Sequence, residues 1–214
     1  MGVDLSPAML EYARQHNSQG SIAYELLDIT SPTEVAAFIS KNGQFQRVYC
    51  FLCFHFVPDQ TVAFLNIGNL LAAYGECLVT ACITNPFVDA WQTLHTMPEW
   101  KSWVTDPRDV LPSWYYFNYS GTSAQIEDET RKCVVDAGLE CMACEVTECT
   151  WLLRDVAYVF EFYSDVFPVS VDLPSRDKNA LKEAFIEQLR PLVKETPRGC
   201  EMVVRIYRVH ARPR

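Results

Sequence analysis

The first 84 residues alternate strand-like and helical segments, and this order limits the possible folds more than any other feature of the sequence. Short apolar segments are typical of buried strands, and segments with apolar residues at helical spacing are typical of amphipathic helices. A strand–helix alternation of this kind favours a parallel, doubly wound α/β sheet. The predicted strands cover residues 2–4, 22–27, 45–54 and 76–84, with helices over 6–17, 33–41 and 58–74.

Two local patterns set these boundaries. Ser6 followed by Pro7 is a typical helix start, because serine caps the free backbone N–H groups and proline suits the first helical turn. Residues 45–54 are apolar at both odd and even positions, which predicts a strand buried on both faces. In the second half we expect helices over 123–137, 156–167 and 181–193, one strand within 139–153, and a terminal strand over 201–211.

The stretch between residues 86 and 120 interrupts the alternation. It is rich in tryptophan and tyrosine, and Pro98, Pro107 and Pro112 divide it into short pieces. We expect an insertion of short helices and loops over one end of the sheet. With 214 residues, the chain is long enough for one sizeable core, so residues 1–214 are interpreted as a single domain.

Charge and hydropathy exclude several partners. The net charge is -9, and a chain this acidic lacks the basic surface that a phosphate backbone requires, which argues against nucleic acid. No apolar run approaches the roughly 18 residues of a membrane-spanning helix. The acidity is interpreted as a solubility feature.

Nine cysteines are scattered through the chain without a preceding secretory signal. An odd, dispersed set favours reduced thiols in a cytoplasmic protein over a disulfide framework. The pairs Cys50-x2-Cys53 and Cys141-x2-Cys144 resemble the two halves of a zinc site. Both pairs lie in apolar runs, however, so we interpret them as buried small hydrophobes and predict no metal site.

Polar residues at predicted strand ends are the best candidates for a site, since ligands of open parallel sheets bind beyond the carboxyl ends of the strands. Asp4 and Asp28 each follow a strand, and two such acids suit a nucleoside, one for the ribose and one for the adenine amino group. Helix capping is the alternative role for both. His55, after the third strand, either lines a pocket or caps the next helix.

Several of these segments together resemble the class I S-adenosylmethionine (SAM)-dependent methyltransferases. The similar segments are Gly2–Ala13, Leu27-Asp28-Ile29, Phe45–Phe51 with Phe54–Asp59, and Tyr74–Val79. The resemblance implies a Rossmann-like, mostly parallel sheet with an antiparallel C-terminal strand, and SAM as cofactor. It also implies the residues that border the cofactor, namely Asp4, Leu5, Asp28, Ile29, Cys50 and Phe51.

Within that class the chain is most similar to arthropod juvenile hormone acid methyltransferases. This similarity implies methyl transfer from SAM to the carboxylate of a small apolar acid of terpenoid or fatty-acid type. It implies that His55 and Phe56 position the substrate, with Phe56 standing where the family usually has tryptophan. It also implies that an aromatic lid lines the substrate site through Trp91, Trp100, Trp103 and Trp114.

The sequence starts at what resembles the end of a strand, so we expect a methyltransferase fragment without its first strand and glycine-rich loop. That strand would lie between the second and fourth strands of the sheet. We therefore predict that residues 1–4 pair directly with residues 46–52, or that a gap opens. Two other functions stay open: an inactive, methyltransferase-derived binding or regulatory protein, and, less favoured, a nicotinamide-dependent oxidoreductase.

Overall fold

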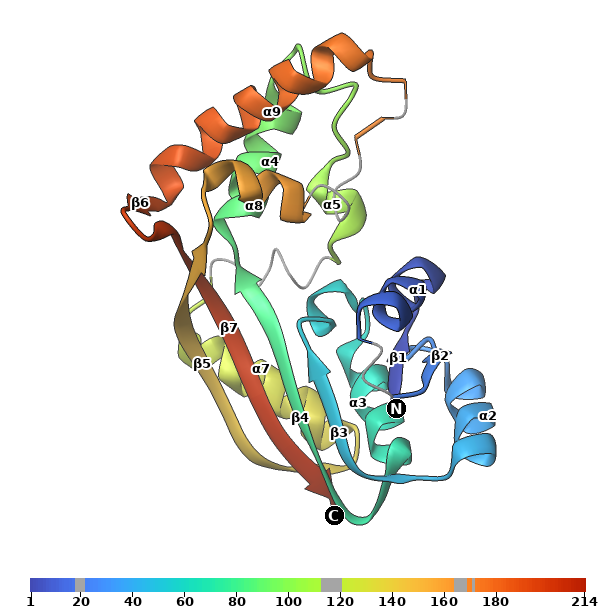
Figure 1. Ribbon diagram of the computed structural model, residues 1–214. Helices are drawn as coiled ribbons and strands as arrows, with labels where there is room; N and C mark the ends of the chain where they lie inside the picture. The colour runs from blue at the N-terminus through green and yellow to red at the C-terminus, as the bar shows by residue number, and fades with distance from the viewer. Residues whose placement is uncertain (18–21, 113–120, 164–168, 171) are drawn as a thin grey trace.

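The computed structural model describes residues 1–17, 22–112, 121–163, 169–170 and 172–214. Its larger sheet has the strand order β3-β4-β7-β5, with β6 paired to β7 (Figure 1). β7 runs antiparallel to β4 and β5, whereas β3 and β4 are parallel. The predicted α/β fold with an antiparallel terminal strand is therefore confirmed. The strands are β3 (Phe45–Phe51), β4 (Leu71–Thr84), β5 (Leu139–Leu153), β6 (Lys194–Thr196) and β7 (Gly199–Pro213).

A second sheet contains only β1 (Gly2–Asp4) and β2 (Tyr24–Leu26), which pair in parallel. Within the described residues, no strand pairing joins this sheet to β3, although the two lie beside each other and point the same way (Figure 1). The predicted alternative of a gap is therefore confirmed, and direct pairing of residues 1–4 with 46–52 does not occur. β1 and β3 each keep one free parallel edge facing the gap.

The helices after β1, β2 and β3 each begin directly after a capping side chain, and the cap predicted at Ser6 is confirmed. The side chains of Ser6, Ser31 and Asp59 accept hydrogen bonds from backbone N–H groups in the first turn. These bonds satisfy donors that a helix cannot satisfy internally. The three helices are α1 (Pro7–His16), α2 (Pro32–Asn42) and α3 (Gln60–Leu70).

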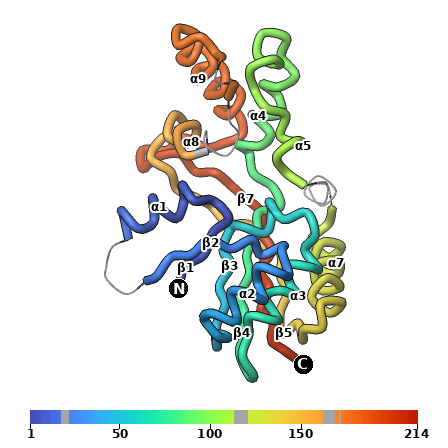
Figure 2. Tube along the Cα trace, turned by 90° about the vertical axis from the view of Figure 1, so that its right-hand side faces the viewer, coloured from blue at the N-terminus to red at the C-terminus, as the bar shows by residue number. Residues whose placement is uncertain are grey.

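One face of the larger sheet is covered by α3 and α7 (Ser123–Asp136), which lie on the same side in Figure 2. Their apolar residues form a core cluster with the strands that includes Phe64, Ile67, Val79, Ile126 and Val209. The smaller sheet attaches to the same assembly through a cluster formed by Leu27, Val35, Phe38 and Leu70. α3 therefore contacts both sheets.

A separate helical layer stands beyond one end of the larger sheet. It contains α4 (Pro86–Thr96), α5 (Pro107–Val110), α8 (Val156–Tyr163) and α9 (Ser175–Leu189), followed by the short η2 (Arg190–Leu192) (Figure 1). The predicted insertion over one end of the sheet thus contains a regular helix, α4. The core of this layer includes Phe87, Trp91, Leu94, Phe185 and Leu189. In the described part of the chain, no helix is long and apolar enough to cross a membrane.

The expectation that residues 45–54 form a fully buried strand is wrong. β3 ends at Phe51, and the side chains of Tyr49 and Phe51 are 60% and 58% exposed. Val48 and Cys50, on the other face of the strand, pack against the α3–α7 core. β3 is apolar on both faces, but it lies at the edge of its sheet and only one of its faces is covered.

The boundary between α3 and β4 also differs from the prediction. The helix ends at Leu70 rather than near Tyr74, and β4 begins at Leu71 rather than Glu76. Gly75 explains part of this, since a Cβ there would lie 3.0 Å from the carbonyl oxygens of Ala72 and Phe45. Only glycine permits this close backbone approach, which lets β4 bend against the start of β3.

Candidate functional site

The carboxyl ends of β1 and β2 bring the two predicted acids together. Asp4 is the last residue of β1 and pairs with Leu26, and the carbonyl oxygen of Asp4 accepts a hydrogen bond of 3.1 Å from Leu27 N. The exposed carboxylate of Asp4 accepts a bond of 2.7 Å from Ser6 N through Oδ1. Asp4 thus helps to fix the turn into α1 while its side chain remains open to solvent.

The carboxylate of Asp28, like that of Asp4, accepts hydrogen bonds from the residues that follow it. Its Oδ1 accepts hydrogen bonds from the backbone N and the Oγ1 of Thr30, at 2.8 and 2.7 Å. Its own backbone N–H donates to Glu34 Oε2 at 3.1 Å. These bonds shape the turn that leads into α2, whereas the helix caps are Ser6 and Ser31, so neither acid caps a helix. The local bonds do not exclude binding, because a carboxylate has several acceptor positions.

The end of β3 completes this edge even though β3 is not paired with β1. The interaction with Cys50 lowers the pKa of the Cys53 thiol, against burial and the negative charges of Asp4 and Asp28, which act to raise it. Each of the two carboxylates is thus within electrostatic range of Cys53. Leu5 and Phe51 are exposed at the same strand ends, whereas Ile29 and Cys50 are half-buried against the core. The structure therefore brings the predicted cofactor residues to one edge.

His55 lies in η1 (Phe54–Phe56), directly after this edge. Burial lowers the pKa of His55 to about 4, so the imidazole is neutral at pH 7. Its Nδ1 accepts a hydrogen bond from Cys82 N at 3.4 Å, which assigns the ring proton to Nε2. The neighbouring ring of Phe56 is 38% exposed, and its centroid lies 4.2 Å from that of His55.

The predicted lid tryptophans lie in the helical layer, with different exposures. Trp91 is fully buried in α4 and donates from Nε1 to the carbonyl oxygen of Thr105 at 3.1 Å. Trp100 and Trp103 are partly buried against the same core. Trp114 lies outside the described residues.

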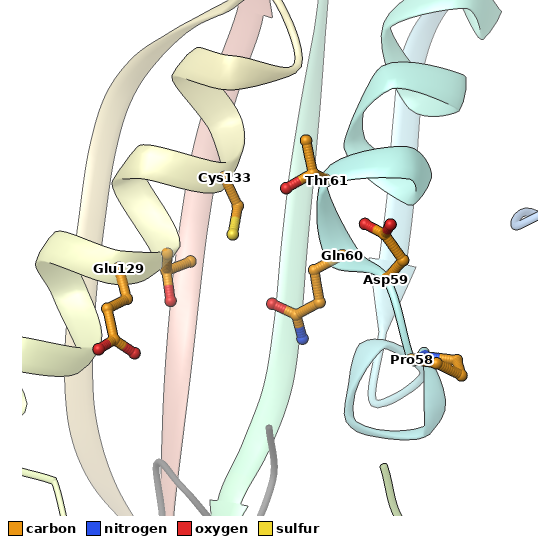
Figure 3. A pocket seen from close by; sticks show the side chains of 7 residues that line it. Pro58, Asp59, Gln60, Thr61, Glu129 and Cys133 are labelled. Atoms are coloured by element: carbon orange, nitrogen blue, oxygen red, sulfur yellow. The ribbon is translucent and has the colours of Figure 1, made fainter. Parts of the chain in front are cut away.

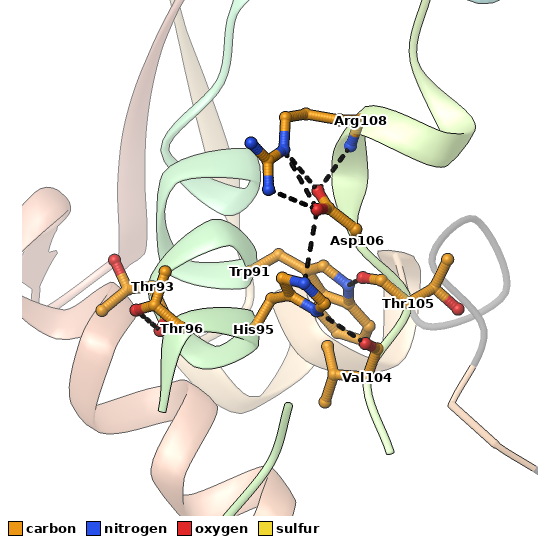
Figure 4. A network of polar contacts seen from close by, with 8 residues as sticks. All are labelled: Trp91, Thr93, His95, Thr96, Val104, Thr105, Asp106 and Arg108. Atoms are coloured by element: carbon orange, nitrogen blue, oxygen red, sulfur yellow. Dashed lines mark hydrogen bonds and ion pairs between the residues drawn. The ribbon is translucent and has the colours of Figure 1, made fainter. Parts of the chain in front are cut away.

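A polar network fixes the chain between α4 and α5 against this tryptophan (Figure 4). His95 contacts the carbonyl oxygen of Val104 through Nδ1 at 3.0 Å and Asp106 Oδ2 through Nε2 at 3.3 Å. Arg108 adds two bonds of 3.0 Å from Nε to the Asp106 carboxylate and holds the pKa of that carboxyl below its usual value. The segment between α4 and α5 that packs against Trp91 is thus held by His95 of α4 and by Arg108 of α5.

A shallow groove of about 290 Å³ lies between the start of α3 and α7 (Figure 3). Its polar lining includes Gln60, whose Nε2 donates to the carbonyl oxygen of Phe54 at 3.1 Å. None of the residues predicted to bind cofactor or substrate lines this groove. The lining residues are Pro58, Asp59, Gln60, Thr61, Glu129, Thr130 and Cys133.

The cysteines only partly match the prediction of buried small hydrophobes. Cys144 is buried, and Cys50 and Cys141 are half-buried, but Cys53 is exposed because it follows the end of β3 instead of lying within it. Among the described residues, no three His, Cys, Asp or Glu side chains gather in a way that could hold a metal ion. Cys53 was not among the predicted site residues, although its position after the third strand was visible in the sequence.

Comparisons with known proteins show which proteins this fold and its first residues are similar to. Residues 1–79 match the family described as a methyltransferase domain. Two solved structures share the fold: the YcgJ protein from Bacillus subtilis (TM-score 0.52, 12% identity, 100% of this chain and 81% of that one) and a SAM-dependent methyltransferase from Anabaena variabilis (TM-score 0.50, 16% identity, 100% and 67%). The chain therefore shares the fold of these proteins, and its first 79 residues are similar to a methyltransferase domain.

Among curated proteins the chain is similar to insect juvenile hormone acid O-methyltransferases. It is 36% identical to that of Bombyx mori over 104 residues, which are 49% of this chain and 36% of the relative. It is 29% identical to that of Drosophila melanogaster over 121 residues, which are 54% and 39% of the two chains. The match spans little more than a third of the length of these relatives.

Proposed function

We propose that this chain carries part of the active site of a SAM-dependent O-methyltransferase that acts on the carboxylate of a small apolar acid. The observation that supports this most directly is the meeting of Asp4 and Asp28 at one strand edge with Cys53 and the neutral His55 close to it. The similarity to juvenile hormone acid O-methyltransferases supports a substrate of terpenoid or fatty-acid type.

The chemistry of the strand edge fits the nucleoside half of the cofactor. Exposed Asp4 offers acceptor oxygens for the vicinal ribose hydroxyls, and Asp28 offers one for the adenine amino group. Leu5, Ile29 and the exposed ring of Phe51 supply apolar surface beside these acids. When bound, SAM supplies a methyl group activated by its sulfonium charge.

His55 fits the role of a substrate-positioning residue. A carboxylate is already deprotonated at neutral pH, so its methylation requires no general base. The neutral imidazole of His55 directs Nδ1 to Cys82 N, which leaves Nε2–H as a donor for one carboxylate oxygen. The other oxygen then remains free to attack the methyl carbon, and precise alignment of the reacting atoms is the main contribution of the site.

The helical layer fits the role of a lid for an apolar chain. Its partly buried Trp100 and Trp103 offer aromatic surface, and Phe56 offers an exposed ring after the end of β3. The proposed lid covers residues 86–120, of which 113–120 lie outside the described residues. Apolar walls exclude water from the carboxylate, which strengthens each remaining polar contact.

The gap between β1 and β3 sets a condition on this function. We propose that activity requires one more parallel strand there, followed by a loop that binds the methionine part of SAM. Two free parallel edges face each other across the gap, and the aromatic rings of Tyr49 and Phe51 stand uncovered on β3. An inserted strand would satisfy both edges, each unmade backbone bond contributing about 1 kcal/mol.

Calorimetric titration with SAM tests the proposal. Two versions are compared for SAM binding: the 214-residue chain, and the same chain extended at the N-terminus by a segment of the Bombyx mori relative. Measurable SAM binding is expected in the extended version. In that version, Asp4→Asn should weaken SAM binding roughly 10- to 100-fold, because a charged acceptor contributes about 1.5–3 kcal/mol. Asp59→Asn, at an exposed helix cap that is not among the residues proposed to bind SAM, serves as the matched control.

An assay of radiolabelled methyl transfer then addresses the substrate. The extended version should methylate a terpenoid or long-chain fatty acid and not a polar acid such as citrate. A version that folds, as judged by circular dichroism, but binds no SAM would contradict the proposal. That result would favour the second function, a methyltransferase-derived binding protein, for which the uncovered aromatic pair on β3 offers a contact surface.

A further inference from the structure

Cys50 and Cys53 form a dithiol pair at the carboxyl end of β3. The thiol of Cys53 is exposed and that of Cys50 is half-buried, and the interaction between the two thiols is the largest influence on the pKa of each. The two sulfur atoms are therefore already neighbours in the folded chain, and one of them is open to reagents in solution.

The backbone between the two cysteines explains why they meet. β3 ends at Phe51, and Leu52 adopts a φ of 55°, in the left-handed region that non-glycine residues seldom occupy. This turn folds Cys53 back toward Cys50 instead of continuing the strand. It is held on both sides, since Leu52 N donates to Thr80 O and Phe56 N donates to Cys53 O, each at 2.9 Å.

The two thiols also differ in reactivity. The interaction between the two thiols lowers the pKa of Cys53 and raises that of Cys50. By contrast, burial raises the pKa of Cys77 to about 11 and those of Cys82 and Cys144 to about 12. The thiolate is the attacking species in disulfide exchange, which favours Cys53 as the first to react and Cys50 as its resolving partner.

We propose that Cys50 and Cys53 form a reversible intramolecular disulfide by exchange with a low-molecular-weight disulfide such as oxidised glutathione. The Cys53 thiolate attacks one sulfur of the reagent, forms a mixed disulfide and releases one reduced thiol. Cys50 then loses its proton and attacks the Cys53 sulfur, which releases the second reduced thiol. The protein loses two protons and two electrons, and one reagent disulfide takes them up to become two thiols.

The chain contains a natural control with the same spacing. Cys141 and Cys144 lie within β5, where each thiol has its own backbone partner: Cys141 Sγ contacts Ala143 O at 3.5 Å and Cys144 Sγ contacts Glu127 O at 3.6 Å. Burial raises the pKa of both. This second pair has the sequence spacing of a redox dithiol without the turn that brings two thiols together.

The experiment equilibrates the chain in buffers with a graded ratio of reduced to oxidised glutathione, alkylates free thiols and measures the labelled sites by mass spectrometry. No Lys or Arg lies between Arg47 and Lys101, so tandem spectra or a second protease must separate Cys50 and Cys53 from Cys77 and Cys82. We expect Cys50 and Cys53 to become protected from alkylation together, and dithiothreitol to reverse this protection. Cys50→Ser should leave one glutathione on Cys53, and Cys53→Ser should leave Cys50 alkylated.

Two controls make the result decisive. The double variant Cys141→Ser/Cys144→Ser should oxidise like the wild type, and an unstructured peptide covering residues 48–56 reports the oxidation expected without the fold. The proposal is overturned if Cys50 and Cys53 stay alkylated in buffers that oxidise this peptide, or if the wild type is protected equally at Cys141 and Cys144. Neither result depends on SAM binding, so this test is independent of the proposed function.

Discussion

His55 is the single residue whose environment depends most on the fold. Burial lowers its pKa from 6.5 to about 4, so the folded chain resists a proton that the unfolded chain accepts. Between pH 6.5 and pH 4 the unfolded state therefore binds more protons than the folded state. The free energy of unfolding must fall as the pH falls through this window, and the contribution of His55 is complete above it.

Replacing His55 should flatten this pH dependence. For wild type, the His55 contribution lowers the free energy of unfolding by about 2 kcal/mol between pH 7.5 and pH 5.0. The His55→Gln variant should lose that part of the change in urea titrations at the two pH values. Gln15→Ala, at an exposed position on α1 without a titrating side chain, should keep the wild-type dependence. An unchanged pH dependence in His55→Gln would show that the ring is not buried as a neutral group.

At the scale of elements, α3 joins the two sheets. One side of the helix packs into the α3–α7 core, and its end contributes Leu70 to the cluster under β1 and β2. The buried side chain of Asn66 adds a hydrogen bond of 2.8 Å from Nδ2 to the carbonyl oxygen of Ile29. The smaller sheet is thus attached through a helix and a loop, without strand pairing to β3.

The variant Asn66→Ala should loosen the smaller sheet selectively. It leaves the carbonyl oxygen of Ile29 without this donor, which costs about 1–3 kcal/mol for a buried group. Amide hydrogen exchange at residues 2–4 and 24–26 should accelerate more than at residues 77–83 of β4. Gln44→Ala removes an exposed side-chain bond to Asn69 O and should change neither region. Equal acceleration throughout the chain would mean that the two sheets unfold as one unit.

At the scale of the whole molecule, the open edge of β3 is the dominant feature. An unpaired parallel edge beside exposed Tyr49 and Phe51 offers a template for another strand. We therefore expect two copies of the chain to associate through this edge, more strongly at higher concentration. The association should also grow with ionic strength, because the net charge of -9 opposes close approach of two copies.

A lysine at this edge should suppress the association. Tyr49 is 60% exposed on β3 and Tyr12 is 58% exposed on α1, so Tyr49→Lys and Tyr12→Lys change the net charge equally at equally exposed positions. Light scattering across a concentration series should show later association only for Tyr49→Lys, since a charge on the edge strand disfavours pairing. Identical curves for the two variants would locate the association elsewhere.

Much of the site could be predicted because its residues are local in the sequence. Asp4 and Asp28 follow short strands and precede capped helices, and each of these signals spans only a few residues. The positions of Cys53 and Trp91 could not be predicted in this way. The exposure of Cys53 depends on the turn at Leu52, and the burial of Trp91 depends on α8 and α9, far along the chain.

The sequence by itself determined the order of strands and helices, the caps, the class of fold and the acids at the strand ends, because these follow from local hydrophobic periodicity and hydrogen bonding. Only the tertiary structure decided which strands pair. The separation of β1 and β2 from β3 is invisible in periodicity, since an apolar strand has the same pattern at an edge as in the centre of a sheet. Burial depends on neighbours supplied by distant segments, and in the described part of the chain β3 pairs with β4 on one side alone.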